Sequence, residues 1–394
     1  MSSTMKQLVS PPLSPRFLPP LSLYIHIPWC VRKCPYCDFN SHATQGGEDI
    51  PEASYIKALL GDLSKELALV SDRTLHSIFI GGGTPSLMSA AGIGEILDFV
   101  KANITCENDM EVTLEANPGT FEQAKFAGFL ERGVNRLSIG VQSFDDDCLQ
   151  ALGRIHSASQ AKLAIGKAQS LGFKRINLDL MHGLPGQSLE KGLTDLQQAL
   201  AFGTDHLSWY QLTIEPNTEF YSRPPNLPDE DILVDIQDQG QILIEAAGLT
   251  QYEISAYSKP GSQARHNLNY WHFGDYIGVG AGAHGKVSAW HDGEMVIERR
   301  VKLRQPKAYM EAITPLASSH CVAPEELQLE FFMNVLRLQK GVSSSTYLAN
   351  TGQALTQVEI AVASARQAGL LMPDRLQATP LGWRFLNDLL GYFE

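Results

Sequence analysis

Three cysteines lie within eight positions near the start of this 394-residue chain, at Cys30, Cys34 and Cys37. Their thiolates are soft ligands of the kind that zinc and iron–sulfur clusters prefer. A four-iron cube takes four ligands, so three local cysteines leave one iron whose ligand must come from elsewhere. Either a fourth protein ligand completes a structural zinc or electron-transfer site, or the open iron binds another molecule.

His26 and His42 are close enough in the sequence to serve as further ligands, which keeps zinc as an alternative. Structural zinc sites usually combine two separated pairs of ligands, whereas these cysteines share one tight segment. The spacing therefore favours an iron–sulfur cluster. Three other cysteines are scattered, and we expect them to be small buried residues without a chemical role: Cys106, Cys148 and Cys321.

A second set of candidate residues follows other predicted strands. Residues 81–85 read GGGTP, and adjacent glycines let a backbone approach a ligand closely, although an ordinary strand–helix turn is the alternative. Each of four polar side chains at or just beyond the ends of successive strands could alone be a surface residue or a helix cap, but their common register favours a shared site. They are Glu115, Gln142, Arg154 and Asp179.

The elements that must position these residues alternate between strand and helix. Six units of this kind predict a parallel sheet with right-handed crossovers. Polar motifs at the strand ends then share the C-terminal rim of a β/α barrel, where active sites lie. We therefore expect an α/β fold, a partial (β/α)6 TIM-type barrel that is open at one side. The expected strands are 21–27, 75–81, 110–117, 136–143, 175–181 and 206–214, with the first helices at 55–70, 89–102 and 121–132.

The composition is that of an ordinary globular protein, with 44% hydrophobic and 19% charged residues. A formal net charge of −12 gives no general attraction for phosphate backbones, so we expect no nucleic-acid partner. No apolar run approaches the ~20 residues that span a bilayer. Six cysteines in this length do not form a disulfide framework, and the cytoplasm is the expected compartment.

We divide the chain into four parts. Residues 1–20 are rich in Ser and Pro, lack the apolar region of a secretory signal, and are expected to be a flexible tail. Residues 21–250 form the β/α core, and residues 251–324 are a connecting region that contains HNLNYW. Residues 325–394 are expected to form a mainly helical, winged-helix-like module.

The cysteine spacing after the first strand resembles the radical S-adenosylmethionine (SAM) superfamily. In that family three cysteines hold a [4Fe–4S] cluster and SAM chelates the fourth iron. The resemblance implies that the glycine turn contacts the SAM amino group, that carboxylates bind its ribose or amino group, and that an arginine binds its carboxylate. The residues implied as SAM contacts are Tyr24, Tyr36, Gly82, Gly83, Thr84, Glu115, Gln142, Arg154 and Asp179.

Further motifs resemble the HemN-like group of that superfamily, among them IFIGGGTPSLM, NLDLMHGLPGQ and HNLNYWHFGDYIGVGAGAHG. The group includes an oxygen-independent coproporphyrinogen III dehydrogenase of porphyrin biosynthesis and a heme-binding chaperone. The dehydrogenase has a fourth cysteine where this chain has Phe39, and the chaperone shares the phenylalanine. His266 begins HNLNYW, which resembles the heme-binding motif HNxxYW of the chaperone. A histidine in a polar loop beside a core aromatic pair is the alternative.

The resemblance therefore implies a heme chaperone that binds heme through His266, transfers it to acceptor proteins, and carries a [4Fe–4S] cluster and SAM. The alternative function is that of the dehydrogenase, and we do not expect its activity because of Phe39. Another radical SAM reaction stays open. A homodimer and a peripheral membrane contact are compatible with this interpretation. We expect His182 and His284 to belong mainly to local turns.

Overall fold

The first strand, β1 (Leu21–Ile27), is buried on both faces and lies in the middle of a 12-stranded sheet. The computed structural model describes residues 17–44 and 50–394. Six strands follow one another in parallel in chain order, which confirms the expected six-unit core. After β1 they are β4 (Thr74–Gly82), β5 (Thr105–Ala116), β6 (Arg136–Gln142), β7 (Arg175–His182) and β8 (His206–Gln211).

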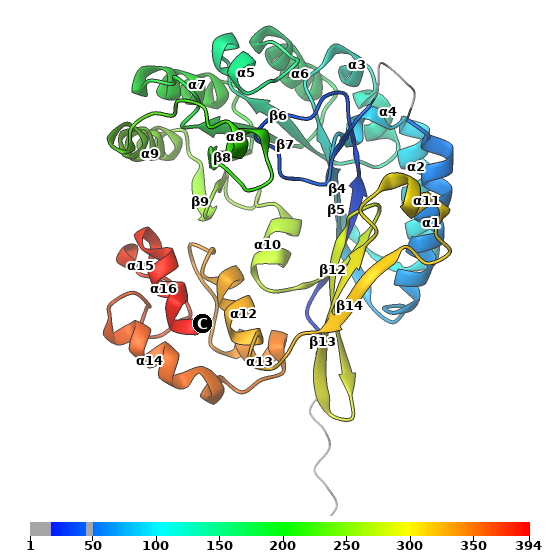
Figure 1. Cartoon of the computed structure of the whole chain (residues 1–394), viewed down its shortest axis with the longest axis vertical. Coiled ribbons are helices and arrows are strands. Elements are labelled where there is room, and N and C mark those ends of the chain that lie inside the picture. Colours follow the sequence, from blue (N-terminus) through cyan, green and yellow to red (C-terminus); the bar gives the residue numbers. More distant parts are fainter. Residues whose placement is uncertain (1–16, 45–49) are drawn as a thin grey trace, which may run out of the picture.

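Helices in the crossovers cover the outer face of these strands (Figure 1). The helix expected at 121–132 is divided into two short helices, and between them the Lys125 ammonium donates to the carbonyls of Ser86, Leu87 and Met88. The helices of this part are α1 (Glu52–Ala68), η1 (Pro85–Leu87), α2 (Ala90–Asn103), α3 (Thr120–Gln123), α4 (Phe126–Glu131), α5 (Asp146–Ala151), α6 (Ala158–Ser170), α7 (Leu189–Ala201), α8 (Glu219–Ser222) and α9 (Glu230–Ala246).

The sheet continues beyond the six strands at both edges, with further strands that include residues of the expected heme-motif and connecting region, 251–324. Next to β1 lies β11 (Asp275–Val279), in parallel, followed by antiparallel β12 (His284–His291), β13 (Glu294–Lys302) and β14 (Leu316–Cys321). At the opposite edge β10 (Ala256–Ser258) and β9 (Thr250–Glu253) are antiparallel to β8. The sheet order ends at β14 and β9, so the described sheet is open.

A buried ion pair replaces apolar packing at the start of β11. Asp275 is fully buried and accepts hydrogen bonds from Lys286 Nζ (2.8 Å), Arg73 Nη1 (2.7 Å) and the backbone N–H of Ser288 (2.9 Å). Buried charges need such paired contacts. The sequence did not indicate β11 because the strand has only five residues and lies in a glycine-rich stretch, between Gly274 and Gly280.

A C-terminal helical module with its own hydrophobic core lies beside the open end of the sheet (Figure 1). Two isolated antiparallel bridges, Val342 with Leu376 and Leu371 with Ala378, lie within this module. After α10 (Arg265–Trp271) and α11 (Pro306–Glu311), the remaining helices are α12 (Leu327–Val335), α13 (Ser345–Thr351), η2 (Leu355–Val358), α14 (Glu359–Gln367), α15 (Pro380–Arg384), α16 (Leu386–Leu390) and η3 (Gly391–Phe393).

The expected flexible tail, residues 1–20, lies mostly outside the described residues. Its last residues are attached to the sheet, because the Pro20 carbonyl accepts from the N–H of Asp275 (2.9 Å) and the Phe17 carbonyl accepts from Trp290 Nε1 (3.1 Å). Among the helices of residues 17–44 and 50–394, none combines the length and apolar character needed to cross a membrane.

Candidate cofactor site

The three clustered cysteines lie in a loop that two short strands close at its base. β2 (Trp29–Cys30) pairs in parallel with β3 (His42–Ala43). Cys30, Cys34 and Cys37 all line one cavity of about 370 Å³ at the C-terminal ends of the parallel strands. The loop therefore brings the predicted thiols to the rim where the other candidate residues also lie.

The environment of these thiols fits a multi-iron cluster. Among the described residues no group of three or more His, Cys, Asp and Glu side chains has the geometry to hold a metal ion. A cube does not require such convergence, because each thiolate binds a different iron. Arg154 Nη1 lies 3.6 Å from Cys34 Sγ and the Ser41 hydroxyl lies 3.7 Å from Cys37 Sγ, and donors of this kind tune cluster sulfurs.

His26 does not offer a ligand for zinc. Its Nε2 donates to the Asn40 carbonyl at 2.9 Å, so its Nδ1 accepts from the Tyr24 hydroxyl at 2.8 Å. Burial lowers the pKa of His26 to about 4. Both ring nitrogens are therefore used within the protein, and His42 is not among the described residues that line the cysteine cavity.

The glycine turn is held tightly against the end of β1. Gly82 has φ +111°, and a Cβ there would lie 2.5 Å from the His26 ring, so a side chain cannot be accommodated. The N–H groups of Gly83 and Thr84 donate to the carbonyls of Ile27 and Trp29, at 2.7 Å each. The turn can therefore offer carbonyl oxygens to the cavity, which suits a ligand with an ammonium group.

The four predicted rim residues, together with Tyr36, Gly82, Gly83 and Thr84, line the same cavity as the cysteines. Asp179 accepts from Ser138 Oγ and Asn177 Nδ2, both at 2.8 Å. Burial and the charge of Asp179 raise the pKa of Glu115 to about 8. Gln142 has φ +66°, an uncommon conformation for a residue with a side chain and one that is often found at functional sites.

A second cavity, of about 540 Å³, adjoins the first. HNLNYW lies on α10 rather than in a loop, and His266, Tyr270 and Trp271 from this helix line the second cavity. Tyr24 lines this cavity and not, among the described lining residues, the cysteine cavity where the resemblance implied it. Of the residues that the structure describes, three line both cavities and so form the wall between them: Phe39, Gly82 and Glu115.

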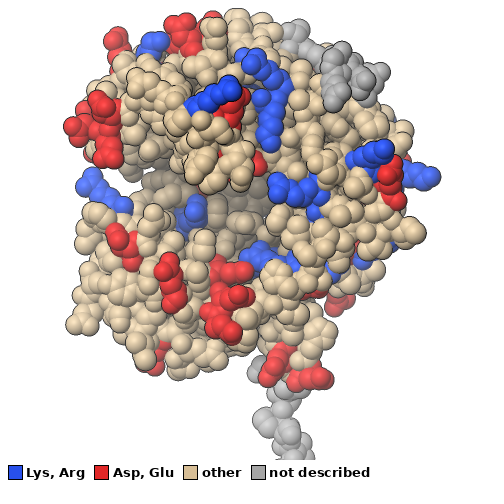
Figure 2. Space-filling model, viewed as in Figure 1, with Lys and Arg blue, Asp and Glu red and all other residues tan. Residues whose placement is uncertain are grey.

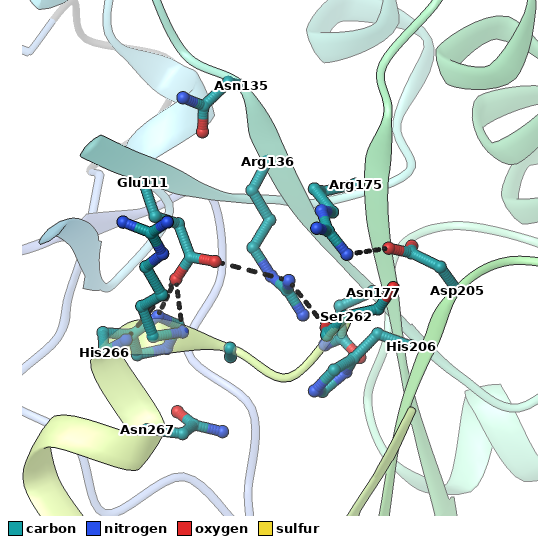
Figure 3. Close-up of polar contacts among 12 residues, drawn as sticks. Glu111, Asn135, Arg136, Arg175, Asn177, Asp205, His206, Ser262, His266 and Asn267 are labelled. Carbon is teal, nitrogen blue, oxygen red and sulfur yellow. Dashed lines mark hydrogen bonds and ion pairs between the residues drawn. The ribbon is translucent and has the colours of Figure 1, made fainter. Parts of the chain in front are cut away.

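His266 is held in place by a carboxylate, shown in Figure 3, and by the aromatic ring of Phe79. Its Nδ1 lies 3.3 Å from Glu111 Oε1, and its ring centroid lies 4.1 Å from that of Phe79. Burial lowers the pKa of His266, although the contact with Glu111 opposes the shift. Burial alone would raise the pKa of Glu111, but the hydrogen bond from His266 and the charge of Arg136 hold it at about 2. The imidazole is therefore neutral at neutral pH, the form that binds iron.

The other histidines and cysteines singled out in the sequence lie in different surroundings. His182 is buried against Trp209, with ring centroids 4.4 Å apart, and His284 is an exposed residue at the rim of the second cavity. Of the scattered cysteines, Cys148 is buried as expected, Cys106 is half-buried, and Cys321 is exposed because it lies on the edge strand β14.

Sequence reasoning missed Glu111 and Arg136, because neither belongs to a recognisable motif. Asn117 was also missed. It accepts from Arg154 Nη2 at 2.7 Å, and its place directly after the strand that carries Glu115 was a usable signal.

A parallel sheet with a three-cysteine loop directly after its first strand is the architecture of radical SAM proteins. The model of the Radical SAM superfamily matches residues 24–198, and that of the HemN C-terminal domain matches residues 322–385. The chain is 51% identical to the heme chaperone HemW of Escherichia coli (strain K12), over 95% of this chain and 98% of that protein.

It is also 38% identical to the mitochondrial radical S-adenosyl methionine domain-containing protein 1 of Mus musculus, over 82% of this chain and 74% of that one. The solved structure of coproporphyrinogen III oxidase (HemN) from Escherichia coli has the same fold, with a TM-score of 0.79 at 20% identity over 96% of this chain and 91% of that one. The chain belongs to the HemW family of the radical SAM superfamily. Its family cofactors are a [4Fe–4S] cluster and SAM.

Proposed function

We propose that the chain is a heme chaperone that binds heme in the 540 Å³ cavity and passes it to acceptor proteins. The observation that carries this proposal is the position of His266, a neutral imidazole on the wall of a cavity rich in aromatic side chains. The name of its relatives from Escherichia coli and Haemophilus influenzae, heme chaperone HemW, supports the same function.

The second cavity suits a flat, largely apolar cofactor. Its volume falls within the range of about 300–1,000 Å³ that is typical of cofactor sites. Tyr270, Trp271 and Tyr276 provide aromatic faces, and the ring centroids of Tyr270 and Trp271 lie 5.1 Å apart. The face in Figure 2 is hollowed between the β/α part and the C-terminal module.

The cysteine cavity would hold the cluster and SAM. Cys30, Cys34 and Cys37 are the proposed iron ligands, and Tyr36, Gly82, Gly83, Thr84, Glu115, Gln142, Arg154 and Asp179 are the proposed SAM contacts. When bound, the cluster and SAM supply one-electron reductive chemistry. Arg154 stands between Cys34 and Asn117, where its guanidinium can orient a carboxylate beside the thiols.

The test is a titration of ferric heme into the purified wild type and into His266→Ala. We expect the variant to lose the Soret band of the ligated heme and to bind at least ten times more weakly. His284→Ala is the matched control, because His284 lines the same cavity without a carboxylate partner among the described residues. An unchanged affinity and Soret band in His266→Ala would show that His266 is not the ligand.

The dehydrogenase activity of the HemN-like group is the second candidate, favoured by the set of rim residues around the cysteine cavity. Phe39 stands where the dehydrogenase has a cysteine, and no thiol of the described residues replaces it at the wall between the cavities. An anaerobic assay with reductant, SAM and coproporphyrinogen III is expected to give no protoporphyrinogen IX. Turnover would replace the chaperone proposal with the enzymatic one.

The partners follow from the same proposal. Heme-acceptor proteins would be met in the cytoplasm, at the hollow face between the sheet and the C-terminal module. A homodimer, a peripheral membrane contact and radical SAM catalysis are compatible with this arrangement. Size-exclusion chromatography and vesicle sedimentation of the heme-loaded chain test the first two.

A further inference from the structure

A buried carboxylate contacts three groups at the start of α10. Oε1 of Glu111, on β5, accepts from the backbone N–H of Arg265 at 2.8 Å and from that of His266 at 3.4 Å. The same oxygen lies 3.3 Å from Nδ1 of the His266 ring. One carboxylate oxygen therefore fixes both the first turn of the helix and the imidazole that the helix carries (Figure 3).

Glu111 is itself anchored by a buried arginine. Arg136, only 1% exposed, places Nη1 3.5 Å from Glu111 Oε2 and 3.3 Å from the carbonyl of Ser262. The guanidinium cannot lose its proton, so it holds a permanent positive charge beside the carboxylate. Arg136, Glu111 and His266 thus form a fixed row from the interior of the sheet to the wall of the second cavity.

This row determines which ring nitrogen of His266 carries the proton. A carboxylate only accepts hydrogen bonds, so Nδ1 must donate. The neutral ring is then the Nδ1–H tautomer, and its lone pair is on Nε2. Among the described residues none hydrogen-bonds Nε2, and contact with Phe79 restricts rotation of the ring.

We propose that Glu111 is a positioning residue for the iron ligand: it holds His266 with Nε2 directed to the heme and makes the imidazole a stronger electron donor. This inference rests on the proposed heme-binding function. A carboxylate on the second nitrogen of a metal-binding histidine fixes ring orientation and raises ligand basicity, and its loss typically costs 10-fold to 100-fold in affinity.

The experiment measures the binding of ferric heme and the midpoint potential of the bound heme in the full-length chain. We expect Glu111→Ala to bind heme 10-fold to 100-fold more weakly. Glu111→Gln keeps an acceptor oxygen and is expected to recover most of the affinity, but to shift the potential in the positive direction because the negative charge is gone. Glu107→Gln is the matched control, since Glu107 is exposed on the same strand and pairs with Arg265 (3.1 Å) rather than with His266.

A double variant separates positioning from a general structural effect. In a His266→Ala background, Glu111→Ala is expected to weaken heme binding no further, because Glu111 acts through His266. A second loss of equal size would overturn the inference. The inference would also be overturned if both single variants at position 111 had the affinity, Soret band and midpoint potential of the wild type.

The tautomer of His266 can also be measured in the wild-type protein, so this test does not depend on the folding of a variant. Nitrogen-15 NMR of histidine-labelled apoprotein is expected to show the Nδ1–H tautomer for His266, and the Nε2–H tautomer would overturn the inference. The two proposals also fail differently. If His266→Ala binds heme normally, His266 is not the heme ligand. If His266→Ala loses heme binding but the variants at position 111 bind heme normally, only the positioning role of Glu111 is wrong.

Discussion

The backbone N–H of Gly82 donates a hydrogen bond to Oε2 of Glu115 over 3.1 Å, and both residues line both cavities. The bond joins the turn after β4 to the end of β5 at the wall between the proposed cluster site and the proposed heme site. Glu115 is thus a fixed group that a ligand on either side can contact.

Removal of this carboxyl group should affect the SAM side first. We expect Glu115→Ala to weaken SAM binding by about 10-fold to 100-fold, because a hydrogen bond to a charged group contributes about 1.5–3 kcal/mol. Equilibrium dialysis of SAM with the cluster-loaded protein measures the change. Iron content should stay constant, and Glu95→Ala, an exposed position on α2, should behave as wild type. Unchanged SAM affinity would remove Glu115 from the SAM contacts.

Each of the three clustered thiols should be necessary for the cluster. We expect Cys30→Ala, Cys34→Ala and Cys37→Ala to reduce iron from about four per chain toward none after anaerobic reconstitution. Cys106→Ala is the control, because Cys106 is half-buried on β5, away from the cavity. Iron and sulfide analysis gives the result. Retention of iron by any of the three variants, or zinc in the wild type, would contradict the assignment.

Much of the fold and of the cysteine cavity was predictable from the sequence. The six parallel strands have apolar runs because both of their faces are buried. β1 was predicted with the same bounds that the structure shows. Parallel strands end at one rim, so polar residues after successive strands meet there. Glu115 and Asp179 are far apart in the chain and line one cavity for this reason.

The rest depended on contacts between distant segments. β11 was not indicated because it has only five residues in a glycine-rich stretch, and its pairing with β1 joins segments far apart in the chain. Glu111 looked like an ordinary alternating residue of β5, and only the fold brings His266 to it. The family resemblance implied Tyr24 as a SAM contact, and among the two cavities its side chain lines the second one.

Phe39 is an exposed aromatic side chain, 59% accessible, that lines both cavities. We expect Phe39→Ala to change the free energy of unfolding by no more than about 0.5 kcal/mol, as is usual for surface positions. Heme should nevertheless leave the protein several-fold faster, because Phe39 contributes the aromatic part of the wall between the cavities. Transfer to apomyoglobin, followed by absorbance, measures the rate. Val31→Ala, 47% accessible in the same loop, is the control, and equal rates in both variants would contradict the prediction.

Asp275 should contribute strongly to stability at neutral pH. Burial alone would raise its pKa, but the charges of Lys286 and Arg73 hold it below the ordinary value. Its contribution is therefore present above the ordinary pKa of about 3.9 and is lost as pH falls through the lower folded-state value. We expect Asp275→Ala to lose about 3–5 kcal/mol at pH 7, because Lys286 is left buried and unpaired.

Chemical denaturation of Asp275→Ala and wild type at several pH values gives this comparison. The difference between the two should shrink as pH falls toward the folded-state pKa of Asp275. Asp72→Ala, at an exposed position beside Arg73, should differ little from wild type at any pH. A difference that grows in acid would show that the sign of the pKa shift is wrong.

The pairing of β1 with β11 has a consequence for the order in which the protein forms on the ribosome. β1 begins at Leu21 and its partner strand begins at Asp275. Because synthesis proceeds at about 5–20 residues per second, one edge of β1 stays unpaired for more than about ten seconds. The described residues that line the cysteine cavity end at Tyr210, whereas those of the second cavity extend to Arg304. The described residues that line the cysteine cavity have therefore all been synthesised before the last residues of the proposed heme cavity.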